Sequence, residues 1–337
     1  MNSLSLSQPE GRILDSIEQR PATAGKSTSG ASLDYIAAPD GHRIPVRHWP
    51  VAKPRAVVRI AHGMSEHSGC YEDIVPRLNA AGYAVIAHDH RCHGAAVPQA
   101  ALGNVSASQH WANICSDMFE VNQHARRLYP GVPLALLGHS MGSFISLDFT
   151  ESHSADIDVL MLEGTNYEPS WFCRLAQGLA TFECWRQGEQ GRSAILHALS
   201  FGGFNKTIKN PRTDYDWISR DTAFVDRYAA DPLCGFQCSN GYWRDFLGGL
   251  AVIYKARNMA KIRPDLPIYL FAGSADPVGH KGKRIKTLAQ KLMKAGVRMV
   301  DARVYEGARH DILHETNADE IIHDLLTWLD KALPARQ

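Results

Sequence analysis

Short apolar strands alternate with helical segments along most of the chain, and this alternation limits the possible folds more than any other feature. Strands are predicted at 33–51 (a hairpin), 54–62, 83–88, 132–137 and 158–162. Helices are predicted at 66–81, 111–128 and 141–150. Continuous apolar strands are typical of a sheet that helices cover on both faces. The pattern therefore predicts an α/β fold with a mostly parallel, doubly wound sheet.

The alternation stops once, over residues 167–261, where no clear strand can be recognised. It resumes with a strand at 268–272, a helix at 281–295, a strand at 298–305 and a final helix at 318–333. We interpret 167–261 as a helical cap inserted into a single core formed by 32–166 and 262–337. This segment holds 16 of the 29 aromatic residues, which either pack the cap on the core or line an apolar pocket.

Residues 1–31 are rich in Ser, Thr and Gly and contain no apolar stretch of the kind found in a secretory signal, so we expect a flexible N-terminal tail. No apolar run elsewhere reaches the ~18 residues that span a membrane. The seven cysteines are scattered, without a Cys-x-x-Cys pair. This distribution favours reduced thiols in a cytoplasmic protein over a disulfide framework or a zinc ribbon.

The charge is nearly balanced, with 36 basic and 35 acidic side chains and a formal net charge of +1. Binding to nucleic acid requires a basic excess or a basic patch, so we expect no nucleic-acid partner. The hydrophobic fraction of 45% also excludes a disordered chain. These values indicate a folded protein that can bury a sizeable core.

A Gly-x-Ser-x-Gly motif, made of Gly138, His139, Ser140, Met141 and Gly142, lies directly after a predicted strand and directly before a predicted helix. In this context the serine occupies a tight turn that projects its hydroxyl from the edge of the sheet, and the glycines permit the turn. Ser140 is therefore the candidate nucleophile.

A serine hydroxyl needs a base, and on this kind of fold the acid and the histidine follow the serine in chain order. Asp276 and His310 each lie just past the end of a predicted core strand, at the sheet edge where α/β folds build their sites. We predict the triad Ser140, Asp276 and His310, in which Asp276 orients the imidazole. The alternatives at this stage are Glu163 as the acid, and His139, His280 or His314 as the base.

Acyl transfer also needs N–H donors that stabilise the oxyanion of the tetrahedral intermediate. One donor is expected from the residue after the nucleophile, Met141, and the other from the loop after the first buried strand. That loop reads His-Gly-Met from His62, so the second predicted donor is the backbone of Met64.

Taken together, the motifs resemble the monoacylglycerol lipase and lysophospholipase branch of the α/β-hydrolases. The resemblance rests on His62–Gly69, Asp89–Gly94, Gly138–Gly142, Ser274–Pro277 and an acidic residue after His310. It implies a serine carboxylester hydrolase that acts on lipid-like monoesters, with a helical cap that forms an acyl tunnel and with no cofactor. The sequence departs from the family at Cys70, where Arg is usual, and at Cys92, where Gly is usual.

Three other functions stay open at this point. His310 and His314 imitate a zinc-binding His-Glu-x-x-His motif, although a zinc site needs both on one face of a helix together with a third ligand. A receptor that binds a ligand without chemistry is the second alternative. The third keeps the triad but applies it to small non-lipid esters, to peptides or to acyl transfer. Whether the cap also touches a membrane surface transiently is left open.

Overall fold

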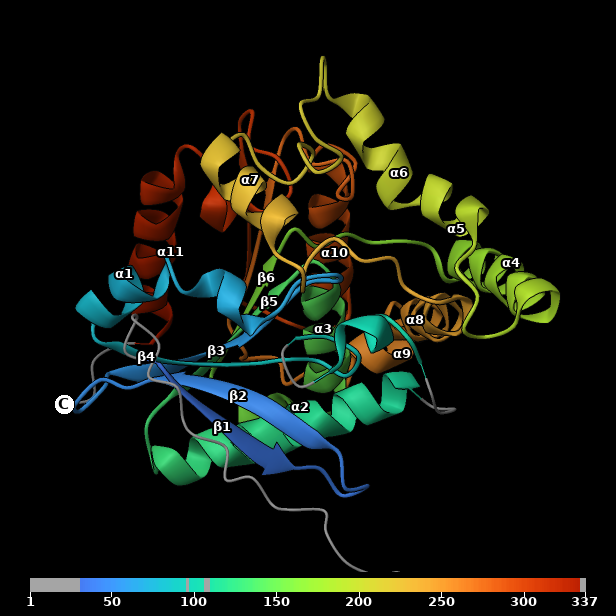
Figure 1. Cartoon of the computed structure of the whole chain (residues 1–337). Helices are drawn as coiled ribbons and strands as arrows, with labels where there is room; N and C mark the ends of the chain where they lie inside the picture. The colour runs from blue at the N-terminus through green and yellow to red at the C-terminus, as the bar shows by residue number, and fades with distance from the viewer. Residues whose placement is uncertain (1–30, 95–96, 106–109, 334–337) are drawn as a thin grey trace, which may run out of the picture.

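A computed structural model describes residues 31–94, 97–105 and 110–333 (Figure 1). Across these residues, eight strands form one sheet in the order β1-β2-β4-β3-β5-β6-β7-β8. The strands are β1 (Ser32–Ala37), β2 (Arg43–Trp49), β3 (Ala56–Ala61), β4 (Tyr83–His88), β5 (Leu134–His139), β6 (Val159–Glu163), β7 (Ile268–Gly273) and β8 (Val300–Tyr305). Strands β3 to β8 pair in parallel, whereas β1 and β2 pair antiparallel at one edge.

Helices cover both faces of this sheet. The helices of the core are η1 (Ser68–Tyr71), α1 (Val75–Ala80), η2 (Gln99–Ala101), α2 (His110–Leu128), α3 (Met141–His153), η3 (Ser154–Asp156), α10 (Lys283–Lys294), η5 (Ile312–His314) and α11 (Ala318–Ala332). Figure 1 shows α1 and α11 on one side of the sheet and α2, α3 and α10 on the other. This arrangement confirms the predicted doubly wound α/β fold.

Strand β5 shows why the central strands are apolar at most positions. Ala135 and Leu137 pack into a core cluster with α1 and α11. Leu136 points the other way and packs with α2, α3 and α10. Because consecutive side chains of a strand alternate between faces, a strand covered on both faces needs apolar residues throughout.

The prediction of one helix over 66–81 was wrong. The structure has a short 3-10 helix, η1, and then a separate helix, α1, with Pro76 in its first turn. Proline has no backbone N–H, so it fits the first turn of a helix but not the interior of a longer one. Strand β5 also runs two residues further than predicted, through His139, which places Ser140 directly between β5 and α3.

Between β6 and β7 the chain forms helices and no strand, as Figure 1 shows, and every residue of this stretch is described. The helices are α4 (Ser170–Gln187), α5 (Ala194–Leu199), α6 (Phe201–Phe204), η4 (Asn205–Thr207), α7 (Thr222–Ala230), α8 (Asn240–Ile253) and α9 (Ala256–Met259). They form the inserted helical cap. The boundaries 167–261 stay a prediction, and residues 1–30 of the predicted tail lie outside the described residues.

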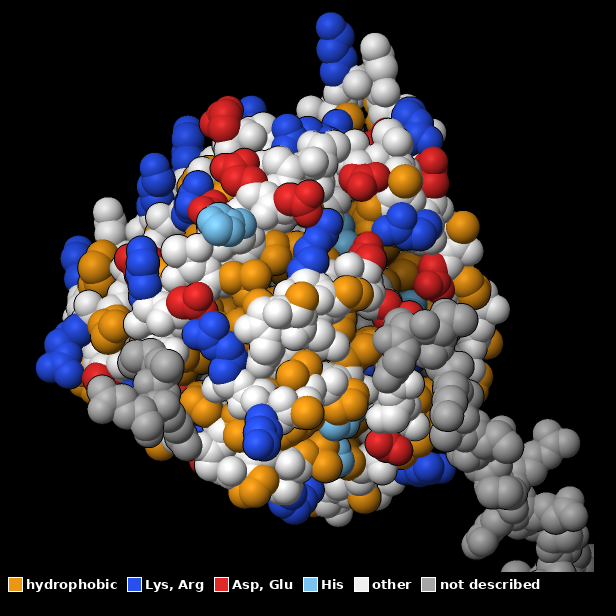
Figure 2. Space-filling model, turned by 90° about the vertical axis from the view of Figure 1, so that its left-hand side faces the viewer, with side chains coloured by type: hydrophobic (Ala, Val, Ile, Leu, Met, Phe, Trp, Pro, Cys, Tyr) orange, Lys and Arg blue, Asp and Glu red, His pale blue; other side chains and the backbone are white. Residues whose placement is uncertain are grey.

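Figure 2 shows positive and negative side chains interspersed over one face of the molecule, consistent with the balanced composition. Among the described helices, none is both long enough and apolar enough to cross a membrane.

Candidate active site

Ser140 sits in a strained turn between β5 and α3. Its backbone has φ of 49° and ψ of −117°, a conformation that residues other than glycine rarely adopt. The Ser140 N–H donates to the carbonyl oxygen of Glu163 at 2.9 Å, which fixes the turn against the end of β6. Strain at a residue held on both sides by regular structure is a feature of functional sites.

The two glycines of the motif are required by close contacts. A Cβ on Gly142 would lie 2.0 Å from the carbonyl oxygen of Ala61, at the end of β3. A Cβ on Gly138 would lie 2.5 Å from the carbonyl oxygen of Gly142. The first turn of α3 therefore packs directly against the start of the loop that follows β3.

Asp276 and His310 are brought together at the ends of β7 and β8. His310 Nδ1 lies 2.9 Å from Asp276 Oδ1, and both side chains are buried. The carboxylate also accepts hydrogen bonds from the backbone N–H groups of Val278 at 2.8 Å and Gly279 at 3.2 Å. These contacts fix the carboxylate so that it holds the imidazole by one nitrogen and leaves Nε2 for other chemistry.

The His310 ring contacts two other rings. Its centroid is 5.0 Å from that of His139, the residue before Ser140, and 5.1 Å from that of Trp217 in the cap. Within the described residues, the buried Nε2 atom has no hydrogen-bond partner. The contact from Nε2 to the Ser140 hydroxyl is therefore not formed in this conformation. Such contacts are often long in free enzymes and tighten when the substrate binds.

The two predicted oxyanion donors belong to adjacent parts of the structure. Met141 is the first residue of α3, where backbone N–H groups have no acceptor within the helix. Met64 lies in the loop after β3, which the contact of Gly142 with Ala61 brings next to α3. The Met64 and Met141 side chains belong to the same core cluster. The backbone of Gly63, beside Met64, is held by the Glu66 carboxylate at 2.5 Å.

Glu163, the rival acid, does not face the imidazole of His310. Its Oε1 accepts the backbone N–H groups of Ile312 at 2.8 Å and Leu313 at 3.0 Å, just after His310. Its Oε2 lies 3.5 Å from His139 Nδ1. Glu163 thus supports the segment that carries His310 rather than the histidine itself.

The rival bases are placed less favourably. Burial lowers the pKa of His139, but the carboxylates of Glu163, Asp311 and Glu66 raise it to about 10, so its imidazole is protonated at neutral pH. His280 pairs with Glu168 at 3.0 Å on an exposed surface.

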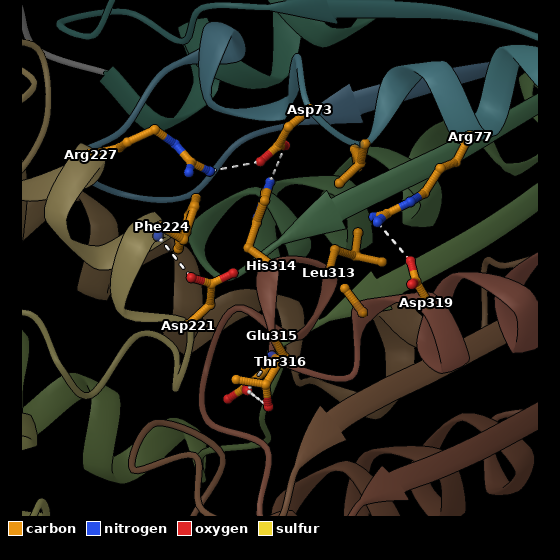
Figure 3. Close-up of a pocket in the computed structure, with 12 residues that line it drawn as sticks. Asp73, Arg77, Asp221, Phe224, Arg227, Leu313, His314, Glu315, Thr316 and Asp319 are labelled. Carbon is orange, nitrogen blue, oxygen red and sulfur yellow. Dashed lines mark hydrogen bonds and ion pairs between the residues drawn. The ribbon is translucent and has the colours of Figure 1, made fainter.

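His314 is held at both ring nitrogens. Nδ1 lies 2.8 Å from Asp311 Oδ1 and Nε2 lies 2.9 Å from Asp73 Oδ1. Figure 3 shows the ring directed toward Asp73, while the Phe224 ring stacks on it at 4.2 Å. Burial opposes protonation, but the two carboxylates raise the pKa of His314 well above its ordinary value. A protonated imidazole held in this way is neither a base nor a metal ligand.

His310 and His314 do not form a shared zinc site, because His310 is hydrogen-bonded to Asp276 and His314 to Asp311. Among the described residues, the side chains spaced closely enough to share a metal ion are His67 with Cys70 and Cys234, and Glu66 with His139 and Asp311. Neither group contains His310.

Sequence reasoning missed the buried polar cluster behind the site. Glu66 accepts a hydrogen bond from the Tyr71 hydroxyl at 2.7 Å, and Asp311 and His139 lie beside it. The only signal available in the sequence was the presence of charged residues inside the motif blocks at 62–69 and 310–315. Their mutual contact depends on three separate segments, which no local pattern reports.

The fold and the arrangement at the ends of β5, β7 and β8 define an enzyme of the α/β-hydrolase class. The family model described as "Serine aminopeptidase, S33" matches residues 52–317, so the chain belongs to this family.

Two relatives match over nearly the whole chain. The monoglyceride lipase of Homo sapiens is 26% identical over 323 residues, which cover 93% of this chain and 95% of the relative. The monoacylglycerol lipase of Mycolicibacterium smegmatis is 26% identical over 308 residues, which cover 90% of this chain and 98% of the relative. These matches confirm the resemblance drawn from the motifs.

Solved structures agree. A thermostable carboxyl esterase from Bacillus coagulans, in complex with glycerol, superposes with a TM-score of 0.82 and 25% identity, covering 90% of this chain and 99% of the esterase. A soluble variant of the Saccharomyces cerevisiae monoglyceride lipase superposes with a TM-score of 0.69 at 21% identity, covering 93% and 100%, which supports the fold. The chain is accordingly a hydrolase of the carboxylester hydrolase class.

Proposed function

We propose that this enzyme hydrolyses lipid-like carboxylic monoesters, of the monoacylglycerol or lysophospholipid type, through an acyl-enzyme on Ser140. The observation that carries the mechanism is the buried contact of 2.9 Å between His310 and Asp276, next to a strained serine turn. Such a pair supplies the base that a serine nucleophile needs.

In the proposed reaction, the Ser140 hydroxyl attacks the ester carbonyl while His310 Nε2 takes its proton. The backbone N–H groups of Met64 and Met141 stabilise the resulting oxyanion. His310 then returns the proton to the leaving alcohol, and the C–O bond of the ester breaks. Water activated by His310 cleaves the acyl-enzyme and releases the acid.

An apolar groove of about 750 Å³ in the cap supports an acyl-chain substrate. Most of its lining comes from α4, α5 and α8: Phe172, Leu175, Leu179, Leu196, Leu199, Trp243 and Leu247. A line of aromatic rings leads from this groove toward the site. Trp243 contacts Phe201 at 6.1 Å between centroids, Phe201 contacts Trp217 at 5.8 Å, and Trp217 contacts His310 at 5.1 Å. The side chains between the groove and His310 are thus largely aromatic, an apolar environment that suits a hydrocarbon chain.

Large apolar side chains on the outside of α4 support transient contact of the cap with a lipid surface. Trp171 is 69% exposed, Leu175 67% and Trp185 80%. Clusters of exposed apolar side chains often mark an interaction site. A lipid surface would place a monoester next to the groove that these residues border.

A panel of substrates tests the proposed class. We expect kcat/KM to rise from p-nitrophenyl butyrate to p-nitrophenyl laurate, and monoacylglycerols or lysophospholipids to be cleaved. Leu196→Trp, which narrows the groove, should lower kcat/KM for the laurate more than for the butyrate. A preference for acetyl or butyryl esters, together with equal effects of the variant on both chain lengths, would contradict a lipid-like substrate.

The family description favours a second candidate, peptide hydrolysis from the amino terminus. The same triad could cleave an amide. An aminoacyl p-nitroanilide in the panel decides between the two, because the proposal expects its turnover to be negligible beside that of the laurate ester.

A further inference from the structure

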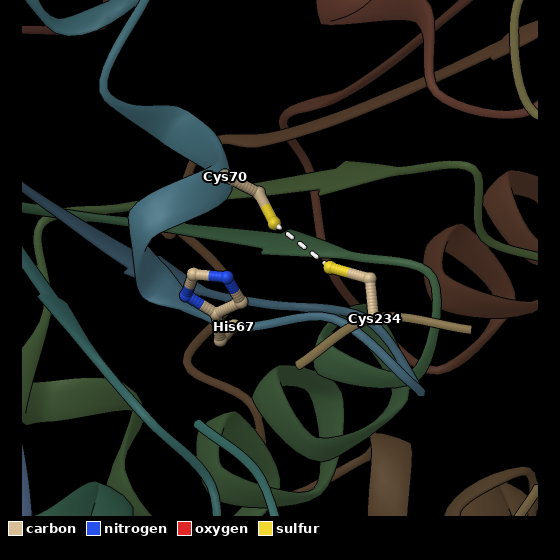
Figure 4. A group of neighbouring side chains, drawn as sticks. All are labelled: His67, Cys70 and Cys234. Carbon is tan, nitrogen blue, oxygen red and sulfur yellow. Dashed lines mark hydrogen bonds between the residues drawn. The ribbon is translucent and has the colours of Figure 1, made fainter. Parts of the chain in front are cut away.

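Two cysteines from different parts of the fold meet beside the loop that carries Met64. Cys70 belongs to η1 in the core, and Cys234 follows α7 in the cap. Figure 4 shows their side chains directed toward each other, and the Sγ atoms are 3.6 Å apart although the residues are separated by 164 positions. Both are free thiols in this structure.

Both cysteines border a cavity at the surface. Each residue is only partly buried, and both line a cavity of about 250 Å³ together with Gly69, Tyr228 and Asp231. A molecule as small as a peroxide fits this cavity. Cys92 and Cys115 are engaged elsewhere: Cys92 donates to the carbonyl oxygen of Asn104 at 2.8 Å, and Cys115 donates to Asp148 at 3.1 Å.

Contacts that do not involve sulfur already hold the two segments together. The Gly235 N–H and the Tyr228 hydroxyl donate to the carbonyl oxygen of Ser65, at 2.9 Å and 2.8 Å. The Ser65 hydroxyl donates to the carbonyl oxygen of Phe236 at 2.7 Å. Hydrogen bonds thus hold the segment before Cys70 against the segments on both sides of Cys234. Forming a disulfide, with its sulfur–sulfur distance of ~2.05 Å, requires the two Sγ atoms to approach each other by about 1.5 Å from 3.6 Å.

We propose that Cys70 and Cys234 are an oxidative modification site, at which a peroxide converts the two thiols into a reversible disulfide that ties the cap to the core. The peroxide first oxidises one thiol to a sulfenic acid and is itself reduced to water. The second thiol then attacks the sulfenic sulfur, an S–S bond forms, and a second water leaves. The two thiols lose two electrons and two protons, and one hydrogen peroxide becomes two waters.

The same side chains, with His67, could be considered a site for a soft metal ion. His67 is less suited to that role because both of its nitrogens are engaged. Nε2 pairs with Asp231 at 3.0 Å, and Nδ1 accepts the Gly69 N–H at 3.1 Å. A metal ion would have to displace one of these bonds, whereas a disulfide leaves both intact.

The test uses the full chain, reduced and then treated with an equimolar amount of hydrogen peroxide. Remaining thiols are alkylated and the digest is examined by mass spectrometry. We expect a linked Cys70–Cys234 peptide, the loss of two free thiols, and a rise in melting temperature of roughly 5 °C, because the bond closes a long loop between cap and core. Dithiothreitol should reverse all three.

Cys70→Ser and Cys234→Ser should each abolish the linked peptide and the rise in melting temperature. Cys184→Ser, at a partly buried cysteine of α4, should behave like the unmodified chain. The proposal is overturned if oxidation falls on other cysteines, or if the linked peptide forms without a change in melting temperature. It is also overturned if the purified protein holds one zinc ion per chain that Cys70→Ser removes.

Discussion

Asp276 holds His310 by a single nitrogen, with Oδ1 2.9 Å from Nδ1 and both side chains buried at the carboxyl edge of the sheet. The carboxylate is fixed in turn by the N–H groups of Val278 and Gly279. The imidazole of His310 also lies 5.0 Å, between ring centroids, from His139, the residue before Ser140. The relationship sets one tautomer and one orientation before any substrate binds.

Replacing the acid tests this relationship. Asp276→Asn keeps the size of the side chain but offers an amide that favours the wrong imidazole tautomer, so kcat for a p-nitrophenyl ester should fall about 10⁴-fold. Circular dichroism should show an unchanged fold. Asp226→Asn, at an exposed carboxylate in the cap, is the control and should retain full activity.

Glu163→Gln separates the two candidate acids. Glutamine keeps an oxygen that can accept the Ile312 and Leu313 N–H groups but removes the charge that faces His139. We expect kcat to fall only about tenfold, which corresponds to about 1.4 kcal/mol. If Glu163→Gln abolishes turnover while Asp276→Asn has little effect, Glu163 is the acid and the assignment is wrong.

The contact at Gly142 predicts a large cost for one methyl group. In Gly142→Ala the new Cβ would lie 2.0 Å from the Ala61 carbonyl oxygen, so the backbone must move. We expect this movement to lower the free energy of unfolding by about 3 kcal/mol. Thermal unfolding should show a melting temperature lower by roughly 5 °C or more. Gly178→Ala is the matched control. Its Cβ would meet open space within α4, so stability should rise by about 0.5 kcal/mol.

Buried histidines predict how stability depends on pH. Burial lowers the pKa of His88, His93 and His110 to about 3. In the unfolded chain these groups titrate near 6.5. Below that pH the unfolded state binds more protons, and each such histidine should cost about 1.4 kcal/mol of stability per pH unit.

Histidines with a raised pKa affect stability on the alkaline side of pH 6.5. The pKa of His139 is lowered by burial but raised to about 10 by neighbouring carboxylates, so its contribution is complete below pH 6.5 and declines as the pH rises toward 10. We therefore expect the melting temperature to be highest near pH 6.5 to 7 and to fall on both sides. A melting temperature that rises steadily from pH 7 to pH 5 would contradict this arrangement of protonation states.

The exposed apolar face of α4 predicts a lipid-dependent phenotype. The double variant Trp171→Ser with Trp185→Ser should lose most association with phosphatidylcholine vesicles in a flotation assay, because both side chains are mainly exposed. Turnover of a dissolved short ester should be unchanged. Equal flotation of the variant and the unmodified chain would exclude this face as the contact surface.

The sheet could be predicted because its signals are local. The apolar runs at β4, β5 and β7 are nearly continuous, and the run at β3 is interrupted only by Arg59. The positions of Ser140, Asp276 and His310 near strand ends could be predicted for the same reason, since Ser140 directly follows β5 and the other two lie within five residues of the ends of β7 and β8. The region after β3 was mispredicted because apolar spacing continues through 66–81, while Pro76 and a 3-10 turn divide it into two elements.

The rest of the site depends on contacts between distant segments. The carboxylate of Glu163 reaches amides that are 149 and 150 positions away, and Cys70 reaches Cys234 across 164. Such pairs leave no periodic trace in one sequence, because their contact depends on how the cap and the strand ends pack. The contacts of Glu163 with His139 and with the segment after His310 could therefore be recognised only in the structure.

The most direct test of the account is to locate the nucleophile with a fluorophosphonate probe. We expect one phosphonyl adduct per chain, mapped to Ser140 by mass spectrometry. In Ser140→Ala, both labelling and turnover of a p-nitrophenyl ester should disappear while the melting temperature changes little. An adduct on another residue, or turnover that survives in Ser140→Ala, would contradict the account.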